Sequence, residues 1–461
     1  MPVRRRTAWS TALLVLVFAL SLPAVTTRFY ASDEIQFFAW LRSAAFDHDA
    51  DFDNEYRYFH DSGAIGDDGF RTTFLDGTNE AGRRRNFTPI GTAVLWAPFF
   101  AAGHLVAVTT GAPADGLSQP YIAAVTFGSA VYGFLTLLLT HAIVRRVIGG
   151  TSWVAIVAVW LGTPLVFYMY VAPGFSHACS AFAVSLFFWI WLRVRGAWTP
   201  AGAAALGASA ALMAMVREQD VFVAAGPALD FLRWTARSAA PGRIGLRTAG
   251  AGVVAAVLAY LPQLAAYQAL NGHPSPTREV ARKMTWWSPH AAGVLWSPEH
   301  GLFFWTPLAL VAVCGLVWLA VRRPRDAAPD ASWIALVALL MFALLTYVSG
   351  SVESWTVAGS FGQRRFVALT PILGLGLASA IHRLRDAGPA VRALGAAALA
   401  VLVWWNVGLM AQFGLHLMDR QRLTLGRNVR VTFVELPSEM PSLVTRYFTD
   451  RASFYRQPRR D

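Results

Sequence analysis

Long apolar runs separated by short polar segments make up most of the sequence. Several runs are close to 20 residues long, which is the length an α-helix needs to cross a bilayer. Counted as spans, they predict an all-α polytopic membrane protein with about 11 transmembrane helices. The predicted spans lie near residues 8–25, 120–144, 151–170, 177–194, 200–216, 219–233, 248–269, 302–321, 331–349, 366–384 and 393–412.

The arginines between the runs predict the orientation. Arg4, Arg5 and Arg6 precede the first run, which places the N-terminus inside by the positive-inside rule. Whether the run at 89–108 spans then determines the side of the membrane on which every later loop lies. If it spans, each later arginine cluster lies outside. We therefore expect this run, which Gly91 and Pro98 also make a poor continuous span, to be re-entrant or to lie at the outer interface.

The two ends of the chain leave alternatives open. The first apolar run could be a cleaved signal peptide or an uncleaved span. We favour the uncleaved span, because an acidic pair follows it at once. The same topology makes residues 1–412 the transmembrane domain and puts the tail, 413–461, outside. The tail holds a strand-like run at 429–435 and several arginines, which mildly oppose the rule.

Composition supports the membrane interpretation and excludes a soluble protein. Of the 461 residues, 55% are hydrophobic and only 14% are charged, whereas a soluble chain carries about 25% charge. The net charge of +12 comes almost entirely from arginine. In a soluble protein it would suggest nucleic acid, but here the positive-inside rule accounts for most of it, so no nucleic-acid partner is expected.

The first outer loop, 26–119, is strongly acidic. Its stretch 33–80 holds 12 of the chain's 27 acidic residues against three arginines. Asp33 and Glu34 open the loop at the predicted membrane surface. They could be a functional acid pair, or solvated residues that begin a short helix with Ser32 as its N-cap.

A second acidic group occupies 47–55 of the same loop. Carboxylate oxygens suit hard divalent cations, although the run lacks the glycine and glutamate spacing of an EF-hand. A solvated acidic turn is the alternative. The metal stays unassigned; the candidate ligands are Glu34, Asp53, Glu55 and His177.

The remaining outer loops collect cations and aromatics. Cationic groups at a membrane surface suit a lipid phosphate, and a carboxylate beside them suits a general base. Each also has a plainer interpretation: the tryptophans can form an interfacial belt, and Arg217 can pair with its acidic neighbours. The candidate substrate-binding residues are His177, Arg217, Arg278, Lys283, Glu299, His300, Arg364 and Arg365.

The arrangement of these residues along the chain resembles that of the GT-C superfamily of membrane glycosyltransferases, especially the protein-mannosyltransferase and aminoarabinose-transferase-like group. The resemblance covers roughly residues 1–385. It is carried by Asp33-Glu34 with Phe37, by the aromatic-x-Pro element Phe87-Thr88-Pro89, and by the segments 173–177, 297–303 and 359–365. Ser176-His177 stands where many relatives carry an Asp, and the Glu-Lys before the proline is absent.

The resemblance implies a GT-C-like bundle and a polyprenyl-phosphate sugar as donor. It implies transfer with inversion to an extracytoplasmic acceptor, with Asp33 as catalytic base. Glu34 would orient Asp33 or support a divalent metal ion. It also implies a bacterial cytoplasmic membrane with the active site outside. The sugar stays open, as does the acceptor, which could be a protein, a lipid or a glycan. A flippase for a lipid-linked glycan is the alternative function, and a non-catalytic scaffold is a third.

Overall fold

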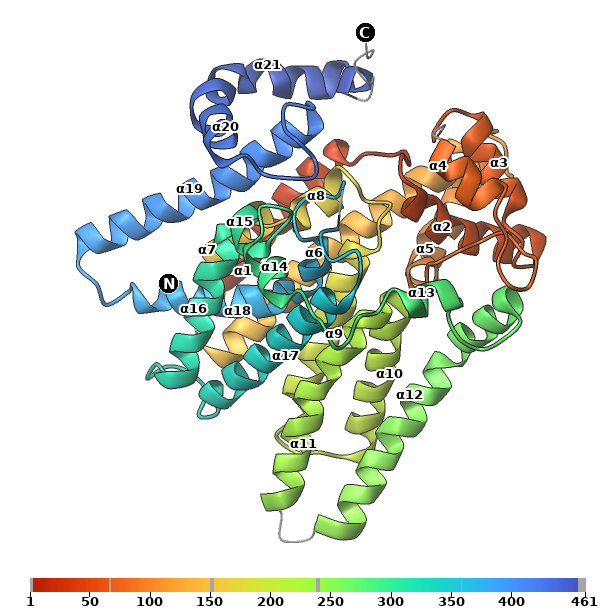
Figure 1. Ribbon diagram of the computed structural model, residues 1–461. Coiled ribbons are helices and arrows are strands. Elements are labelled where there is room, and N and C mark those ends of the chain that lie inside the picture. Colours follow the sequence, from red (N-terminus) through yellow and green to blue (C-terminus); the bar gives the residue numbers. More distant parts are fainter. Residues whose placement is uncertain (1–2, 66–67, 150–152, 238–240, 358, 455–461) are drawn as a thin grey trace.

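The computed structural model describes residues 3–65, 68–149, 153–237, 241–357 and 359–454. Within these ranges the regular structure is helical, and β pairing is confined to two isolated bridges, Thr78–Arg84 and Met284–Val352. Figure 1 shows helices of the spans packed side by side, with the loop-1 helices and the C-terminal helices at one end.

The helices follow one another along the chain in this order. They are α1 (Val3–Ser21), α2 (Ser32–Arg42), α3 (Asp53–Asp61), α4 (Asp68–Phe70), α5 (Gly91–Thr110), α6 (Gln119–Val147), α7 (Trp153–Gly162), α8 (Leu165–Tyr170), α9 (His177–Val194), α10 (Pro200–Val216), α11 (Ala225–Arg237), α12 (Pro241–Asn271), α13 (Arg278–Arg282), α14 (Ala291–Trp296), α15 (Leu302–Trp305), α16 (Pro307–Val321), α17 (Ala331–Ser351), α18 (Thr370–Arg383), α19 (Pro389–Gly414), α20 (Leu425–Arg430) and α21 (Leu436–Thr449). Short 3₁₀ or π turns connect some of them, among them η1 (Leu22–Ala24), η2 (Ser43–Asp47), η3 (Arg71–Leu75), η4 (Glu218–Ala224), η5 (Arg364–Leu369), η6 (Val431–Glu435) and η7 (Arg451–Phe454).

The chain is an all-α multi-pass membrane protein. Seven helical segments of the described residues are long and apolar enough to cross a membrane, and four shorter apolar helices accompany them. The seven are Gly91–Thr110, Gln119–Val147, His177–Val194, Ile244–Asn271, Ala331–Ser351, Arg364–Arg383 and Pro389–Gly414; the four are Thr11–Ala24, Trp153–Gly162, Pro200–Val216 and Pro307–Val321.

Three predicted spans differ from the observed helices. The run near 219–233 is the 3₁₀ turn η4 followed by the charged helix α11, and it is not one of these segments. Prolines interrupt two others: Pro164 separates α7 from α8, and Pro307 begins α16 after α15. Proline lacks the N–H that would continue the helix, which accounts for both breaks. The count of eleven stays a prediction.

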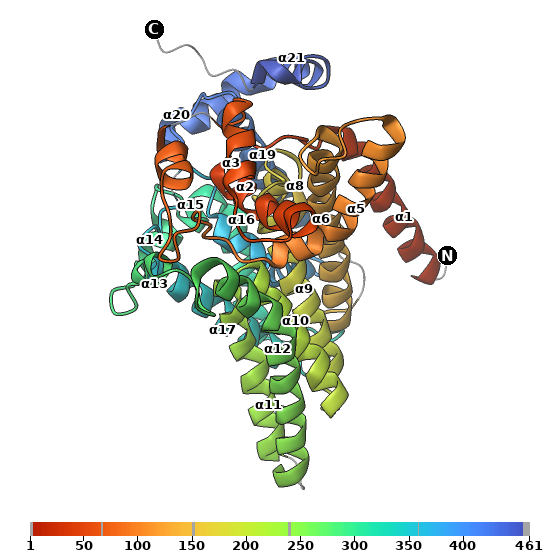
Figure 2. The ribbon, with the colours of Figure 1, turned by 90° about the vertical axis from the view of Figure 1, so that its right-hand side faces the viewer.

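Helix packing is uneven across the molecule. Of an apolar stretch of 18 residues within Arg364–Arg383, 83% is buried, whereas only 11% of such a stretch within Ile244–Asn271 is buried. α12 packs mainly on α10, so closely that a Cβ at Gly207 would lie 2.0 Å from the carbonyl oxygen of Gly252. Small residues permit such approaches between membrane helices. α11 and α12 extend away from the other helices at the bottom of Figures 1 and 2.

The helix α5 is continuous, although Gly91 and Pro98 made the run look like a poor continuous span. A Cβ at Gly91 would lie 2.3 Å from the backbone of Met215, at the end of α10. Gly103, near the other end of α5, packs against Pro120 at the start of α6. The run is long enough to span, and its position as a re-entrant or outer segment stays a prediction.

The C-terminal tail returns to the end of α1. The Tyr447 hydroxyl donates to the carbonyl of Ala24 (2.7 Å), and Arg451 Nη1 donates to that of Val25 (2.9 Å). The tail therefore lies at the end of the bundle where α1 leads into α2, here called the Asp33 end. The strand-like run 429–435 is wrong as a strand, since η6 and its neighbours are helical; Val431 and Thr432 pack their side chains inward.

Candidate active site

α2 carries the acidic pair, and Glu34 organises its first turn. Ala31 is the N-cap rather than Ser32, which is the first helical residue. Glu34 Oε2 accepts hydrogen bonds from the N–H groups of Tyr30 (2.8 Å) and Ala31 (3.1 Å). This is the carboxylate half of a capping box, and it satisfies backbone donors that the helix cannot.

Glu34 points into the protein, where it meets the second outer loop. The side chain is fully buried, and this burial raises its pKa to about 8. A Cβ at Gly174 would lie only 2.7 Å from Glu34 Oε1, so a glycine is required there. Glu34 thus fixes α2 against the loop at 173–177, and its neighbour Asp33 is left to face outward.

Asp33 forms an ion pair with a residue from the far end of the chain. Arg364 Nη1 donates to Asp33 Oδ2 at 3.0 Å across 331 positions of sequence. The two side chains remain 40% and 25% exposed, so a ligand can reach both. Arg364 begins η5, and its guanidinium lies over the ring of Phe175 at 5.5 Å.

Arg217 and His177 extend the cluster. Arg217 caps the end of α10, and its Nη1 donates to His177 Nδ1 at 2.7 Å. This bond requires an unprotonated Nδ1, because arginine can only donate. Arg217 is within electrostatic range of both Asp33 and Arg364. Arg217 also lies within electrostatic range of the buried Asp220. Four segments of the chain therefore bring the Asp33 carboxylate, two guanidinium groups and an imidazole together, with the Asp220 carboxylate close to Arg217.

Two other candidates, Arg365 and His300, hold the segment that carries Arg364. Arg365 is 7% exposed, and its guanidinium donates to the Ser354 hydroxyl (3.1 Å) and the Ser349 carbonyl (3.4 Å). His300 is fully buried, stacks on Trp305 and donates from Nε2 to the Ser360 carbonyl (2.9 Å). Both hold the segment that carries Arg364 and do not open toward the surface.

The remaining candidates lie in other surroundings. Arg278 is exposed, and its backbone N–H donates to Glu80 of loop 1. The Lys283 ammonium lies 5.2 Å from the ring centroid of Phe87. Glu299 is partly exposed, and its backbone N–H donates to the Ser297 hydroxyl. No hydrogen bond or ion pair in the described residues joins these three side chains to Asp33.

The four candidate metal ligands are not brought together. Asp53 pairs with Arg57 and Arg84, and Glu55 with Arg42, while Glu34 and His177 are engaged as described. The described residues contain no group of three or more His, Cys, Asp or Glu side chains that could hold a metal. The residues present do not fit a metal centre, and no step below depends on one.

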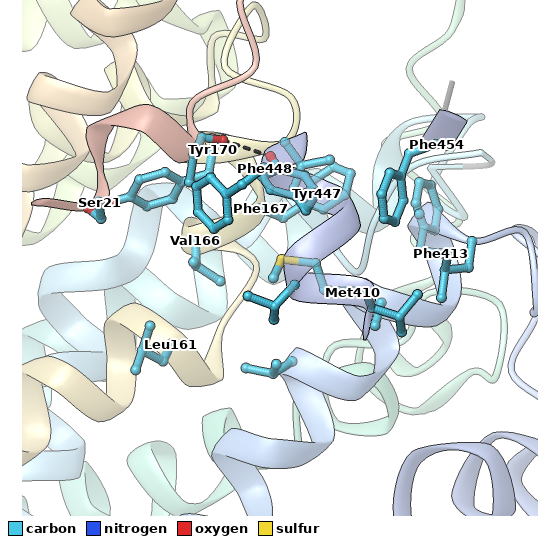
Figure 3. A pocket seen from close by; sticks show the side chains of 18 of the residues that line it. Ser21, Leu161, Val166, Phe167, Tyr170, Met410, Phe413, Tyr447, Phe448 and Phe454 are labelled. Atoms are coloured by element: carbon cyan, nitrogen blue, oxygen red, sulfur yellow. Dashed lines mark hydrogen bonds between the residues drawn. The ribbon is translucent and has the colours of Figure 1, made fainter. Parts of the chain in front are cut away.

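Sequence reasoning missed a large apolar pocket and the aromatic residues near Asp33. The pocket has a volume of about 1490 Å³. Figure 3 shows apolar side chains from α7, α8, α19 and α21 around it. The sequence analysis also did not name Phe175, whose ring lies under the Arg364 guanidinium. Its position in the segment 173–177, between Gly174 and His177, was the only feature of the sequence that could have identified it. No such feature pointed to the pocket, because its walls come from distant helices.

No protein-family model and no curated protein matches the sequence. Solved structures do match. ArnT from Cupriavidus metallidurans bound to undecaprenyl phosphate aligns with a TM-score of 0.54 at 14% identity, over 97% of this chain and 78% of that one. The apo state of the same protein gives 0.48 at 15% identity over 94% and 74%. AglB from Archaeoglobus fulgidus, in complex with an inhibitory peptide and a dolichol-phosphate, gives 0.45 at 14% over 99% and 57%. The predicted resemblance to GT-C glycosyltransferases is confirmed at the level of the fold.

Proposed function

We propose that this protein is an integral-membrane glycosyltransferase that moves a sugar from a polyprenyl-phosphate donor to an acceptor hydroxyl. The observation that carries the proposal is the Asp33–Arg364 ion pair, accessible at the surface and within range of Arg217. The shared fold with ArnT, whose structure holds undecaprenyl phosphate, supports a polyprenyl phosphate as the ligand.

The proposed reaction is a single displacement with inversion at the anomeric carbon. Asp33 accepts the proton of the acceptor hydroxyl, whose oxygen forms the new bond to that carbon. The bond from the anomeric carbon to the phosphate oxygen breaks, and the electron pair leaves with the polyprenyl phosphate. Negative charge develops on that phosphate. Arg364 and Arg217 are the guanidinium groups placed to stabilise it.

The other residues have supporting roles in this proposal. His177 orients Arg217 through its Nδ1, and Glu34 positions Asp33 through the first turn of α2. Arg278, Lys283 and Glu299 are assigned to the outer parts of the substrates. The topology proposed with this function has eleven spans in a bacterial cytoplasmic membrane, with the Asp33 end on the extracytoplasmic side.

Replacing Asp33 by Asn tests the proposal directly. Transfer from a polyprenyl-phosphate sugar should fall by roughly 10²- to 10⁴-fold, the usual contribution of a general base. Asp61→Asn, at a highly exposed position of the same loop, is the matched control and should keep the wild-type rate. Wild-type transfer by a folded Asp33→Asn protein would contradict the proposal, as would glycan translocation without any change in the glycan.

A further inference from the structure

Two polar contacts join the first turn of α9 to the turn that follows α10. Arg217 Nη1 donates to His177 Nδ1 at 2.7 Å, and the Ser180 hydroxyl donates to Asp220 Oδ2 at 2.6 Å. His177 and Ser180 are three positions apart, as are Arg217 and Asp220, and residues at this spacing share a face of a helical turn. α9 and α10 also pack against each other (Figure 1). The two contacts are therefore neighbouring cross-links between the same two turns.

The Asp220 carboxylate is more than a packing group. It is fully buried, and its Oδ1 has no hydrogen-bond partner among the described residues. A buried carboxylate with incomplete hydrogen bonds destabilises the fold, so a role in packing alone does not account for it. The Ser180 hydroxyl could donate equally well to a neutral amide oxygen at this position. The negative charge of Asp220 is therefore the property that calls for an explanation.

Arg217 is the cation on which this charge acts. The backbone N–H of Asp220 donates to the Arg217 carbonyl (2.9 Å), which places both residues in one 3₁₀ turn. Burial lowers the pKa of Arg217, and the Asp220 carboxylate opposes this change more strongly than the Asp33 carboxylate does. Arg217 Nε is also buried and has no hydrogen-bond partner in the described part of the chain. Asp220 thus offsets the cost of holding the Arg217 guanidinium in a buried place beside His177.

Asp33 is the competing carboxylate. It also acts on the charge of Arg217, it is 40% exposed, and it already accepts a hydrogen bond from Arg364. A second arginine on Asp33 would occupy the oxygen that the proposed reaction needs for the acceptor hydroxyl. It would also leave one guanidinium fewer for the phosphate. A buried carboxylate that attracts Arg217 away from Asp33 prevents both effects.

We infer that Asp220 is a positioning residue: fixed by Ser180, it holds the Arg217 guanidinium beside His177 and away from Asp33, ready for a phosphate. The inference rests on the proposed function and adds to it a carboxylate that touches neither substrate. Asp220 forms and breaks no bond in the transfer and carries none of its protons. Its whole effect passes through Arg217, and this is the property that an experiment can isolate.

A double-mutant cycle in the full chain separates this role from a structural one. Asp220→Asn keeps the size of the side chain and an oxygen for the Ser180 hydroxyl, and it removes the charge. It should lower kcat for transfer from a polyprenyl-phosphate sugar by roughly 10- to 100-fold in the wild-type background, as expected for a misplaced group. In the Arg217→Gln background it should change kcat by less than about twofold. The same loss in both backgrounds, or wild-type kcat in a folded Asp220→Asn protein, would overturn the inference.

Two further variants keep the test informative if Asp220→Asn folds poorly. Ser180→Ala retains the charge of Asp220 and removes the hydroxyl that fixes it, so kcat should fall less, by about two- to tenfold, and again only when Arg217 is present. Glu218→Gln is the matched control, because Glu218 lies in the same turn but accepts its hydrogen bond from the Tyr267 hydroxyl of α12. It should keep kcat within about twofold of the wild type. A loss in Glu218→Gln as large as in Asp220→Asn would contradict a specific role for Asp220.

Binding of undecaprenyl phosphate gives a readout that needs no transfer. Its thermal stabilisation of the full chain should weaken in Arg217→Gln and in Asp220→Asn, and no further in the double variant. Stronger stabilisation in Asp220→Asn would show that the carboxylate only repels phosphate, and would overturn the inference.

The outcomes separate the two proposals. If the wild type transfers no sugar while the binding cycle still couples Asp220 to Arg217, the proposed function fails and the positioning role stands. If transfer occurs and depends on Asp33 while neither cycle shows coupling, the positioning role fails and the proposed function stands.

Discussion

Two groups of carboxylates in the first loop meet arginines in different ways. At the acidic tip, 47–55, Glu55 and Asp47 both pair with Arg42, which lies within the same loop. Asp33 instead pairs with Arg364, which arrives from the other end of the chain. A pair within a loop stabilises that loop. A pair between distant segments holds those segments together, and where it is accessible it is a candidate site.

Burial separates the two groups further. The Glu55 side chain is fully buried and that of Arg42 is 12% exposed, so no ligand can replace either partner without opening the loop. Asp33 is 40% exposed, so a ligand can reach this pair without opening the loop. An ion pair by itself is therefore weak evidence for a functional site. Its exposure, and whether its arginine comes from a distant segment of the chain, distinguish a candidate site from a structural pair.

After Asp33 itself, the largest effect should come from removing Arg364. We expect Arg364→Gln to lower the rate of transfer by roughly 10²- to 10³-fold, the usual loss when one donor to a developing charge is removed. The readout is transfer from a polyprenyl-phosphate sugar in membranes. Arg71→Gln, which removes an exposed arginine paired with Asp76, is the control. Equal rates of transfer in both variants would show that the Asp33–Arg364 pair has no special role in transfer.

Removing Arg42 should instead affect stability. Arg42→Gln leaves Glu55 buried without its cation, and we expect the free energy of unfolding to fall by about 3 kcal/mol. Burial already raises the pKa of Glu55 to about 7. The double variant Arg42→Gln/Glu55→Gln should recover much of the loss in thermal unfolding. No recovery would show that Arg42 acts through its other partners.

A smaller effect is expected from Gly174, which joins the second loop to α2. In Gly174→Ala the new Cβ meets Glu34 Oε1 and the Phe29 ring at 2.7 Å. The cost should be about 1–3 kcal/mol of stability, typical of overpacking, together with a loss of transfer as Phe175 shifts beneath Arg364. Gly196→Ala, where the added Cβ meets no atom within 4 Å, should behave as wild type.

The smallest effect, taken per pH unit, concerns the pH dependence of stability. The pKa of Glu34 is raised from 4.5 to about 8, so between these values the folded state keeps a proton that the unfolded state loses. Stability therefore falls as pH rises through this window, at up to about 1.4 kcal/mol per pH unit. Glu34→Gln should remove this part of the slope in thermal unfolding measured from pH 5 to 8. An unchanged slope would assign the dependence to other groups.

The sequence by itself determined the membrane class and most of the helices, and it singled out Asp33 as a candidate. Apolar runs near 20 residues long have one stable outcome in a bilayer, because every backbone polar group must be satisfied within the helix. The breaks at Pro164 and Pro307 could have been anticipated from proline itself. The failure near 219–233 came from counting apolar residues without weighing the charges of α11.

Only the tertiary structure decided which polar residues act together. Asp33 and Glu34 are adjacent in sequence, yet one faces Arg364 and the other is buried beneath Gly174. Of the candidate cations, it brought Arg364 and Arg217 close to Asp33 and placed Arg278 elsewhere. Successive residues of a helix point in different directions, and packing between distant helices fixes which direction becomes the site. The apolar pocket arises in the same way, since no single segment contains it.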